Sequence, residues 1–202
     1  GNYNYTVTDA AGCQAVVTVN ITEPSALSAT ASATDVRCNG YNDGIINISA
    51  SGGTLPYSGT GSFTGLSAGP YSYSVTDGNG CNTQVSALIG SPATLAATAA
   101  TQDALCNGAS NGSIIISATG GTGPYTGTGN YSGISAGSYN YTVTDANGCS
   151  TSVTAIINEP TALNLNETHT QIACNGGSTG TANIFASGGT APYSGTGSFS
   201  GL

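Results

Sequence analysis

The stretch Tyr139–Cys149, YNYTVTDANGC, decides the fold of this chain. Its first residues alternate, with Tyr139, Tyr141 and Val143 separated by polar Asn and Thr. A period of two is typical of a β-strand with one buried face. The Asp-Ala-Asn-Gly after these residues supplies turn-forming residues, including a glycine that tolerates positive φ. The stretch therefore predicts a β-hairpin with a cysteine at its turn.

The same hairpin occurs three times at constant spacing. Gly1–Cys13 reads GNYNYTVTDAAGC, and Gly69–Cys81 reads GPYSYSVTDGNGC. Two sets of cysteines share one period of 68 residues (81 − 13 and 106 − 38): Cys13, Cys81 and Cys149, and Cys38, Cys106 and Cys174. A fixed period of this length indicates an array of small domains.

The period divides the chain into four parts. Pro restricts its own φ and the residue before it, so Glu23-Pro24 and its two counterparts mark short, semi-rigid junctions. We predict a partial repeat with the C-terminal hairpin at 1–22, whole repeats at 23–90 and 91–158, and a partial repeat with the N-terminal strands at 159–202. Both ends fall inside a repeat, which favours a segment of a longer array. The alternative is a subunit whose first hairpin completes its neighbour.

Each whole repeat is predicted to hold about five strands and no helix. Alternating small residues from Leu27 to Ala33 indicate one strand, and Ile46, Ile48 and Ala50 form the inward face of another. Short strands at regular spacing with Gly and Pro turns indicate a sandwich, with antiparallel Greek-key connections as the default. The predicted fold class is all-β, with tandem Ig-like β-sandwich domains of 68-residue period arranged as an elongated fibre.

Composition excludes several classes of partner. The chain has one Lys or Arg against nine Asp and Glu, and a formal net charge of −8. With so few cations we expect no binding to nucleic acid. No apolar run approaches the roughly 20 residues of a membrane helix, so we expect no membrane insertion.

Catalysis has little support in the sequence. A Ser-His-Asp site would have to use the lone His169, and no nucleophile elbow accompanies it. The turn aspartates Asp9, Asp77 and Asp145 offer one carboxylate each, which is too few for a Ca²⁺ site and suits a self-capping turn. We therefore expect no enzyme, and no catalytic, cofactor-binding or metal-binding residue.

Six cysteines in strict register, without a CxxC pair, predict disulfides in an oxidising extracellular setting. We predict Cys38–Cys81 and Cys106–Cys149, each closing a loop worth about 4 kcal/mol in the chain-entropy model. Cys13 and Cys174 would then pair outside the 202 residues. A sandwich can also place the two cysteine-bearing turns at opposite ends. The alternatives are then Cys81–Cys106 and Cys149–Cys174, or a longer-range pairing.

Residues that break the repeat are candidates for contact with a partner. Tyr41 has Ala109 and Gly177 in register, and Arg37 has Leu105 and Ala173. The outward face of the isoleucine strand also varies, and it carries Phe185 in its third copy. We predict Tyr41, Arg37 and Phe185 as contact residues.

Four elements together resemble the SprB repeat family. They are the Cys-Asn-Gly turn at Cys106–Gly108, the GGTxPY segment at Gly120–Tyr125, the hairpin at Ala136–Cys149 and the junction Glu159-Pro160. The resemblance covers the whole chain. One departure is a short GTG segment after the Pro-Tyr pair, where many such repeats have an aromatic-rich strand. The family builds large surface adhesins of gliding bacteria of the Bacteroidota type, and the resemblance implies an extracellular adhesive or filamentous protein exported by the type IX route.

The functional hypothesis is a structural repeat region of an extracellular filament or surface-adhesin stalk on the bacterial cell surface. Its partners would be neighbouring repeats or copies of the same chain. One alternative is a glycan- or surface-binding module that uses the variable strand faces. Another is a pilin-like subunit that polymerises by β-strand complementation.

Overall fold

The computed structural model describes residues 1–202, and the chain consists of β-strands and loops. It forms two compact units, Gly1–Ser91 and Pro92–Leu202, and each is described by itself. Equivalent strands begin 68 residues apart, as Ser28 and Ala96 do (96 − 28), so the all-β fold and the repeat period are confirmed. The chain contains no helix of the length and apolar character that crossing a membrane requires.

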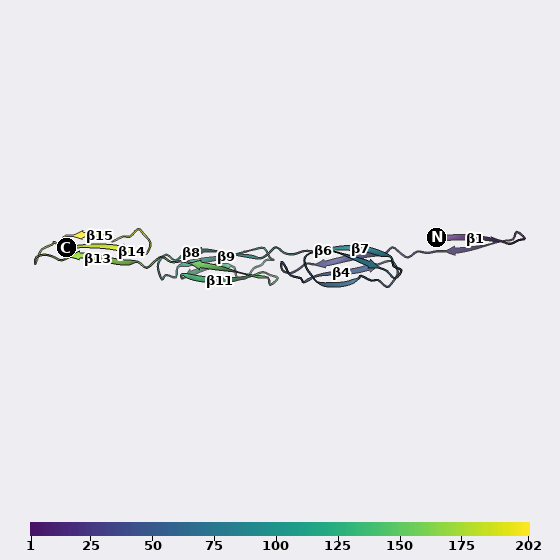
Figure 1. Ribbon diagram of the computed structural model, residues 1–202, viewed down its shortest axis with the longest axis horizontal. Coiled ribbons are helices and arrows are strands. Elements are labelled where there is room, and N and C mark those ends of the chain that lie inside the picture. The colour runs from purple at the N-terminus through teal and green to yellow at the C-terminus, as the bar shows by residue number, and fades with distance from the viewer. The chain divides into compact units, whose positions relative to one another are not determined.

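The first whole repeat is a sandwich of two small sheets (Figure 1). The larger sheet has the order β3-β4-β5, and the smaller one is the hairpin β6-β7. The five strands are β3 (Ser28–Thr34), β4 (Gly44–Ser51), β5 (Gly61–Leu66), β6 (Gly69–Thr76) and β7 (Asn82–Ile89). All pairings within the sheets are antiparallel.

The core lies between the two sheets. On β4, Ile46 and Ile48 are buried, as the alternation predicts. Val75 of β6 and Ile89 of β7 cover them from the other sheet and are buried as well. Phe63 packs against Tyr73 with ring centroids 4.4 Å apart and ring planes tilted by 37°, which adds an aromatic contact between the sheets.

The second whole repeat has the same construction. Its strands are β8 (Ala96–Gln102), β9 (Gly112–Thr119), β10 (Gly129–Ile134), β11 (Gly137–Thr144) and β12 (Ser150–Ile157), in sheets β10-β9-β8 and β11-β12. The buried residues of its core are Ala104, Ile114, Ile116, Val143, Ala155 and Ile157. The two whole repeats thus bury equivalent positions.

The strand topology is simpler than expected. Neighbouring strands in every sheet are consecutive in sequence, so each repeat is a three-stranded meander followed by a hairpin, and the expected Greek-key connection is absent. The chain changes sheets once in each whole repeat, at the two-residue link Ser67-Ala68 between β5 and β6 in the first. Five strands per repeat are also fewer than the seven of an Ig constant domain.

The two partial repeats correspond to the two sheets of a whole one. The hairpin β1 (Asn2–Thr8) and β2 (Gln14–Asn20) is equivalent to β6-β7, and all its residues are exposed. The sheet β13 (Asn164–Thr170), β14 (Thr181–Ser187) and β15 (Gly197–Ser200) is equivalent to β3-β4-β5. Each part has its own ladder of backbone hydrogen bonds but lacks the covering sheet.

Candidate functional site

A buried aspartate organises the hairpin turn of each whole repeat. The Asp145 Oδ1 atom accepts hydrogen bonds from the backbone N–H groups of Asn147 (2.9 Å) and Cys149 (2.9 Å). Its Oδ2 atom accepts one from the N–H of Thr122 at 2.9 Å, which ties the hairpin to the loop after β9. Asp77 makes the same bonds with Asn79, Cys81 and Thr54. Both carboxylate oxygens therefore serve the backbone, which fits the predicted self-capping turn.

These hydrogen bonds also set the ionisation of the two aspartates. Burial alone would raise the pKa of Asp145, but the N–H groups of Thr122, Cys149 and Asn147 outweigh it and the pKa lies below its ordinary value. The pKa of Asp77 is lowered in the same way, against burial, by the N–H groups of Thr54, Cys81 and Asn79. The turn therefore favours an ionised carboxylate.

The two cysteine-bearing turns of a repeat lie at opposite ends of the sandwich. Asp77, in the hairpin turn, binds Thr54, which comes after the C-terminal end of β4. The Cys-Asn-Gly turn at Cys38 precedes the N-terminal end of β4, where the N–H of Val36 donates to the carbonyl of Gly90. An eight-residue strand spans roughly 27 Å, far beyond the reach of a disulfide.

The predicted disulfide pairs are accordingly not formed. Cys38 and Cys149 are disulfide-bonded, whereas Cys13, Cys81, Cys106 and Cys174 carry free thiols. Cys38–Cys81 and Cys106–Cys149 are therefore wrong, because each needs a cysteine that is free. The same finding excludes the alternatives Cys81–Cys106 and Cys149–Cys174 in this structure. The separation of the two turns along β4 is the physical reason why pairing within a repeat fails.

Within Pro92–Leu202, the Cys-Asn-Gly turn of the second repeat is attached to the start of the third. The Asn107 side-chain NH₂ donates to Glu159 Oε1 at 3.0 Å and to the Pro160 carbonyl at 3.1 Å. The N–H of Gly108 donates to Glu159 Oε2 at 2.7 Å. Glu159 thus holds the turn beside the first residues of the next repeat.

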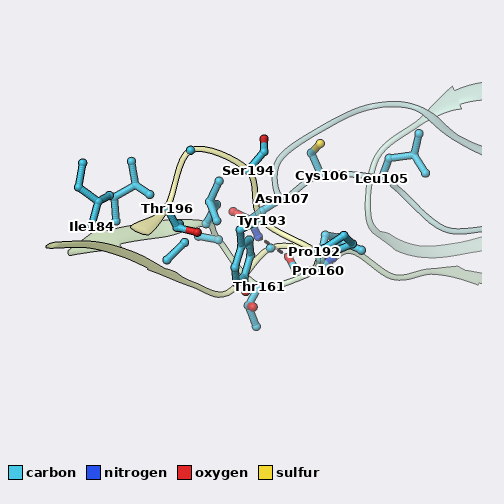
Figure 2. A pocket seen from close by; sticks show the side chains of 17 residues that line it. Leu105, Cys106, Asn107, Pro160, Thr161, Ile184, Pro192, Tyr193, Ser194 and Thr196 are labelled. Carbon is cyan, nitrogen blue, oxygen red and sulfur yellow. Dashed lines mark hydrogen bonds between the residues drawn. The ribbon is translucent and has the colours of Figure 1, made fainter. Parts of the chain in front are cut away.

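An open apolar groove extends from this junction along the sheet β13-β14-β15. It has a volume of about 750 Å³. Figure 2 shows Cys106 and Leu105 at one end, Ile184 and Thr196 at the other, and Tyr193 between them. In the second whole repeat, the residue equivalent to Tyr193 is Tyr125, which packs against the buried core. The groove therefore lies on the side of β13-β14-β15 that is the inward side in a whole repeat.

The predicted contact residues lie at different places. Arg37 forms an ion pair with Asp43, with Arg37 Nε 2.6 Å from Asp43 Oδ2. The hydrogen bond between these two side chains is the main cause that raises the pKa of Arg37 and lowers the pKa of Asp43. Tyr41 is exposed in the same turn, and its N–H donates to the Cys38 carbonyl. Phe185 is exposed on β14 in the other unit. The role of all three in binding stays a prediction.

The inward face of β13 carries a hydrogen-bonded His–Glu pair that sequence reasoning missed. His169 Nδ1 lies 2.9 Å from Glu167 Oε2. The positions equivalent to Glu167 are Ala31 and Ala99, which pack against the cores of the whole repeats. The sequence signal that could have revealed this pair is the glutamate at position 167, where the other two repeats have alanine. No group of three or more His, Cys, Asp or Glu residues is arranged to hold a metal ion.

Comparison with known proteins gives one result. The SprB repeat family matches the chain three times, at residues 30–58, 98–126 and 166–194, with the 68-residue spacing. Each match runs from the first strand of a three-stranded sheet to the residue after the Pro-Tyr pair, and so includes the strand with the buried isoleucines. No curated protein and no solved structure matches the chain.

Proposed function

Because the chain is built from SprB repeats, we propose that it is the structural repeat region of an extracellular filament or of the stalk of a surface adhesin. SprB repeats are structural rather than catalytic, and they are associated with cell-surface proteins. In this proposal each whole repeat is a folded spacer. The work of the segment is mechanical, namely to hold a more distant part of the protein away from the cell.

The main support for the proposal is that the two whole repeats are built in the same way. Ile46 and Ile114 are fully buried at equivalent positions, and so are Val75 and Val143. The turn aspartates Asp77 and Asp145 accept equivalent hydrogen bonds in the two whole repeats. Residues that depart from the register, such as Tyr41, are exposed. A spacer requires a constant construction of this kind and leaves the outer faces free to vary.

The composition supports an exposed location for this spacer. A single Lys or Arg in 202 residues leaves one site for trypsin-like proteases. The net charge of −8 makes neighbouring segments repel one another at low ionic strength. Both properties suit a chain that stands in solvent beside other copies.

In-frame deletion of residues 91–158 in cells that make the protein tests the proposal. The deletion removes one 68-residue period and leaves the flanking repeats in register with each other. We expect immunogold labelling of the remaining repeats on the cell surface and a shorter projection, with adhesion unchanged. Loss of adhesion at normal surface level would contradict a spacer role.

A glycan array with the purified chain distinguishes the spacer from a binding module that uses its variable faces. The spacer role predicts no reproducible hit. Hits that disappear in Tyr41→Ala or Phe185→Ala, with melting temperature unchanged, would favour the binding module instead. Both residues are exposed, so truncating them leaves the cores intact.

A further inference from the structure

Asn-Gly pairs, which are prone to spontaneous chemical modification, occur at six places in the chain. They begin at Asn39, Asn79, Asn107, Asn111, Asn147 and Asn175. In such a pair the backbone nitrogen of the glycine attacks the side-chain carbonyl carbon of the asparagine, and glycine favours this because it has no Cβ to hinder the approach. The glycine nitrogen must first lose its proton, so an acceptor that holds this N–H slows the reaction.

The Asn-Gly pairs of the two hairpin turns are protected by hydrogen bonds. The N–H of Gly148 donates to the Asp145 carbonyl at 3.1 Å. The side-chain NH₂ of Asn147 donates to Thr122 Oγ1 at 3.1 Å, which holds the other reacting group. The pair that begins at Asn79 makes the equivalent two bonds in the first repeat.

Of the remaining pairs, Asn111-Gly112 is protected by burial. Gly112 is buried at the start of β9, and the Asn111 Oδ1 atom accepts from the N–H of Leu105 at 2.9 Å. Asn175 lies in the third Cys-Asn-Gly turn, whose position equivalent to Glu159 is residue 227 (159 + 68), outside the 202 residues. The two whole repeats therefore supply the matched pair of Cys-Asn-Gly turns.

These two turns share one backbone geometry. In each, the N–H of the residue after the glycine donates to the cysteine carbonyl at 3.1 Å. The glycines have similar positive φ, +80° at Gly40 and +73° at Gly108. Asn39 and Asn107 are both exposed, so water reaches both side chains. A difference in reactivity between the turns must therefore come from what holds the glycine N–H.

The turns differ in the residue that precedes the next junction proline. In the second repeat this residue is Glu159, whose Oε2 atom accepts from the N–H of Gly108 at 2.7 Å and whose Oε1 atom binds the asparagine side chain. In the first repeat it is Ser91, whose Oγ atom accepts from the Asn39 side chain at 3.2 Å. Serine has no second oxygen to offer, and the N–H of Gly40 has no acceptor.

From this contrast we propose that Asn39 is a site of deamidation, and that Glu159 protects the equivalent Asn107. The carboxylate of Glu159 holds the proton that the Gly108 nitrogen must lose. Its negative charge also opposes the nitrogen anion and the oxyanion that follow. The proposal goes beyond the spacer role and holds or fails independently of it.

The reaction consumes water and no other reagent. The deprotonated nitrogen of Gly40 attacks Cγ of Asn39, the bond from Cγ to the side-chain nitrogen breaks, and that nitrogen leaves as ammonia with the proton that Gly40 gave up. The product is a five-membered succinimide. Water then opens this ring: attack at the former backbone carbonyl gives isoaspartate, and attack at the former side-chain carbonyl gives aspartate.

Either product changes the turn next to Tyr41. Both place a new carboxylate, ionised at neutral pH, beside Cys38. Isoaspartate also adds one carbon to the backbone between Cys38 and Tyr41, which displaces the bond from the Tyr41 N–H to the Cys38 carbonyl. Deamidation would therefore alter the surroundings of a residue that the sequence predicts as a contact residue.

The test incubates the full chain in mildly alkaline buffer and follows each asparagine by peptide mass spectrometry. Digestion with pepsin at low pH suppresses further reaction, and electron-transfer fragmentation distinguishes isoaspartate from aspartate. We expect Asn39 to react about tenfold faster than Asn107 or more, which is the effect of one hydrogen bond to a charged group. Asn79 and Asn147 should react no faster than Asn107 and serve as internal controls.

Reciprocal substitutions test the residue before the proline at each site. Ser91→Glu should slow the reaction of Asn39 about tenfold, and Glu159→Ser should accelerate that of Asn107 by a similar factor. Glu159→Gln is the matched control, because it retains an acceptor oxygen on a side chain of the same length and removes the charge. It should give a rate between those of the unsubstituted chain and Glu159→Ser.

Three results would overturn the proposal. The first is equal rates at Asn39 and Asn107 in the unsubstituted chain. The second is a rate that does not change at Asn39 in Ser91→Glu, or at Asn107 in Glu159→Ser. The third is a Glu159→Ser chain in which Asn147 accelerates as much as Asn107, because this would mean a general loosening of the repeat rather than the loss of one acceptor.

Discussion

The hairpins β1-β2 and β11-β12 have nearly the same sequence and different surroundings. Both form the same antiparallel register, and in both the turn aspartate accepts bonds from the backbone two and four residues later. They differ in what covers them: Val143 is fully buried between two sheets, whereas Val7 is 67% exposed. The ladder and the turn are therefore encoded locally, and burial is not.

The same comparison separates local from tertiary bonds at the turn. Asp145 has a third bond, from Thr122 to its Oδ2 atom, which the larger sheet supplies. The Asp9 carboxylate accepts only the two local bonds, from the N–H groups of Ala11 and Cys13. A hairpin without its sheet thus has the turn geometry but lacks both the hydrophobic cover and the bond that secures it.

The largest expected effect tests the hydrophobic cover directly. Ile157→Ala should reduce the free energy of unfolding by about 2–5 kcal/mol, because it removes a fully buried side chain and leaves a cavity. Ile21→Ala, at the equivalent exposed position, should change it by less than about 0.5 kcal/mol. Urea denaturation, with hydrogen exchange of β9 for Ile157→Ala and of β2 for Ile21→Ala, measures the two effects. Equal effects would show that the exposed hairpin has a cover in solution.

A smaller effect is expected at the glycine that contacts the turn aspartate. Gly121 has φ +58°, and a Cβ there would lie 2.6 Å from Asp145 Oδ2. Gly121→Ala should destabilise its repeat by about 2–3 kcal/mol, from left-handed backbone strain and displacement of the carboxylate. Gly189 also has φ +58° but has Leu163 as its nearest neighbour at 3.3 Å.

Gly189→Ala should therefore show the backbone strain alone, about 1–2 kcal/mol. Amide exchange of the loops after β9 and after β14 measures the two sites separately. If Gly121→Ala and Gly189→Ala lower the free energy of unfolding by the same amount, the contact with Asp145 contributes nothing to the effect of Gly121→Ala.

Acid should weaken whole repeats and leave the free hairpin little changed. The pKa of Asp145 in the folded chain lies below that of the unfolded chain, near 3.9. Its stabilising contribution is complete above that value and is lost as the pH falls through the folded pKa. Melting temperature should therefore drop below about pH 4, and Asp145→Asn should flatten this part of the profile. A profile that Asp145→Asn leaves unchanged would assign the acid sensitivity to other groups.

The smallest effect concerns the ion pair in the Cys-Asn-Gly turn. Asp43 accepts from the N–H of Arg37, and in the second repeat Asn111 accepts from the N–H of Leu105 in the same way. Asp43→Asn should therefore retain the turn and remove only the charge of a partly exposed side chain, with little change in melting temperature. Asp43→Ala, which removes the acceptor as well, should lower it more. The reverse order would mean that the charge, rather than the backbone bond, holds the turn.

Much of the fold was predictable because its signals are local. The alternation around Ile46 and around Tyr141 identified strands and their inward faces, and Asp145 was recognised as a turn cap. The connection order was not predictable in the same way. The Greek-key default was wrong: hydrogen-bonded neighbours are consecutive strands, and the chain changes sheets once in each whole repeat, at Ser67-Ala68 in the first.

The candidate site shows more clearly what could not be predicted from the sequence alone. Loop-closure entropy favoured Cys38–Cys81, but it depends only on separation along the chain, and β4 places those residues at opposite ends of the sandwich. The groove at Cys106 could not be predicted from the sequence either, since it is formed by residues of two consecutive repeats.

The sequence by itself determined the strands, the turns, the 68-residue period and which side of each strand is apolar, because these depend on residues a few positions apart. The tertiary structure decided which apolar sides are covered, which end of a repeat each cysteine occupies and which cysteines are bonded. Those outcomes depend on how two sheets pack across a core.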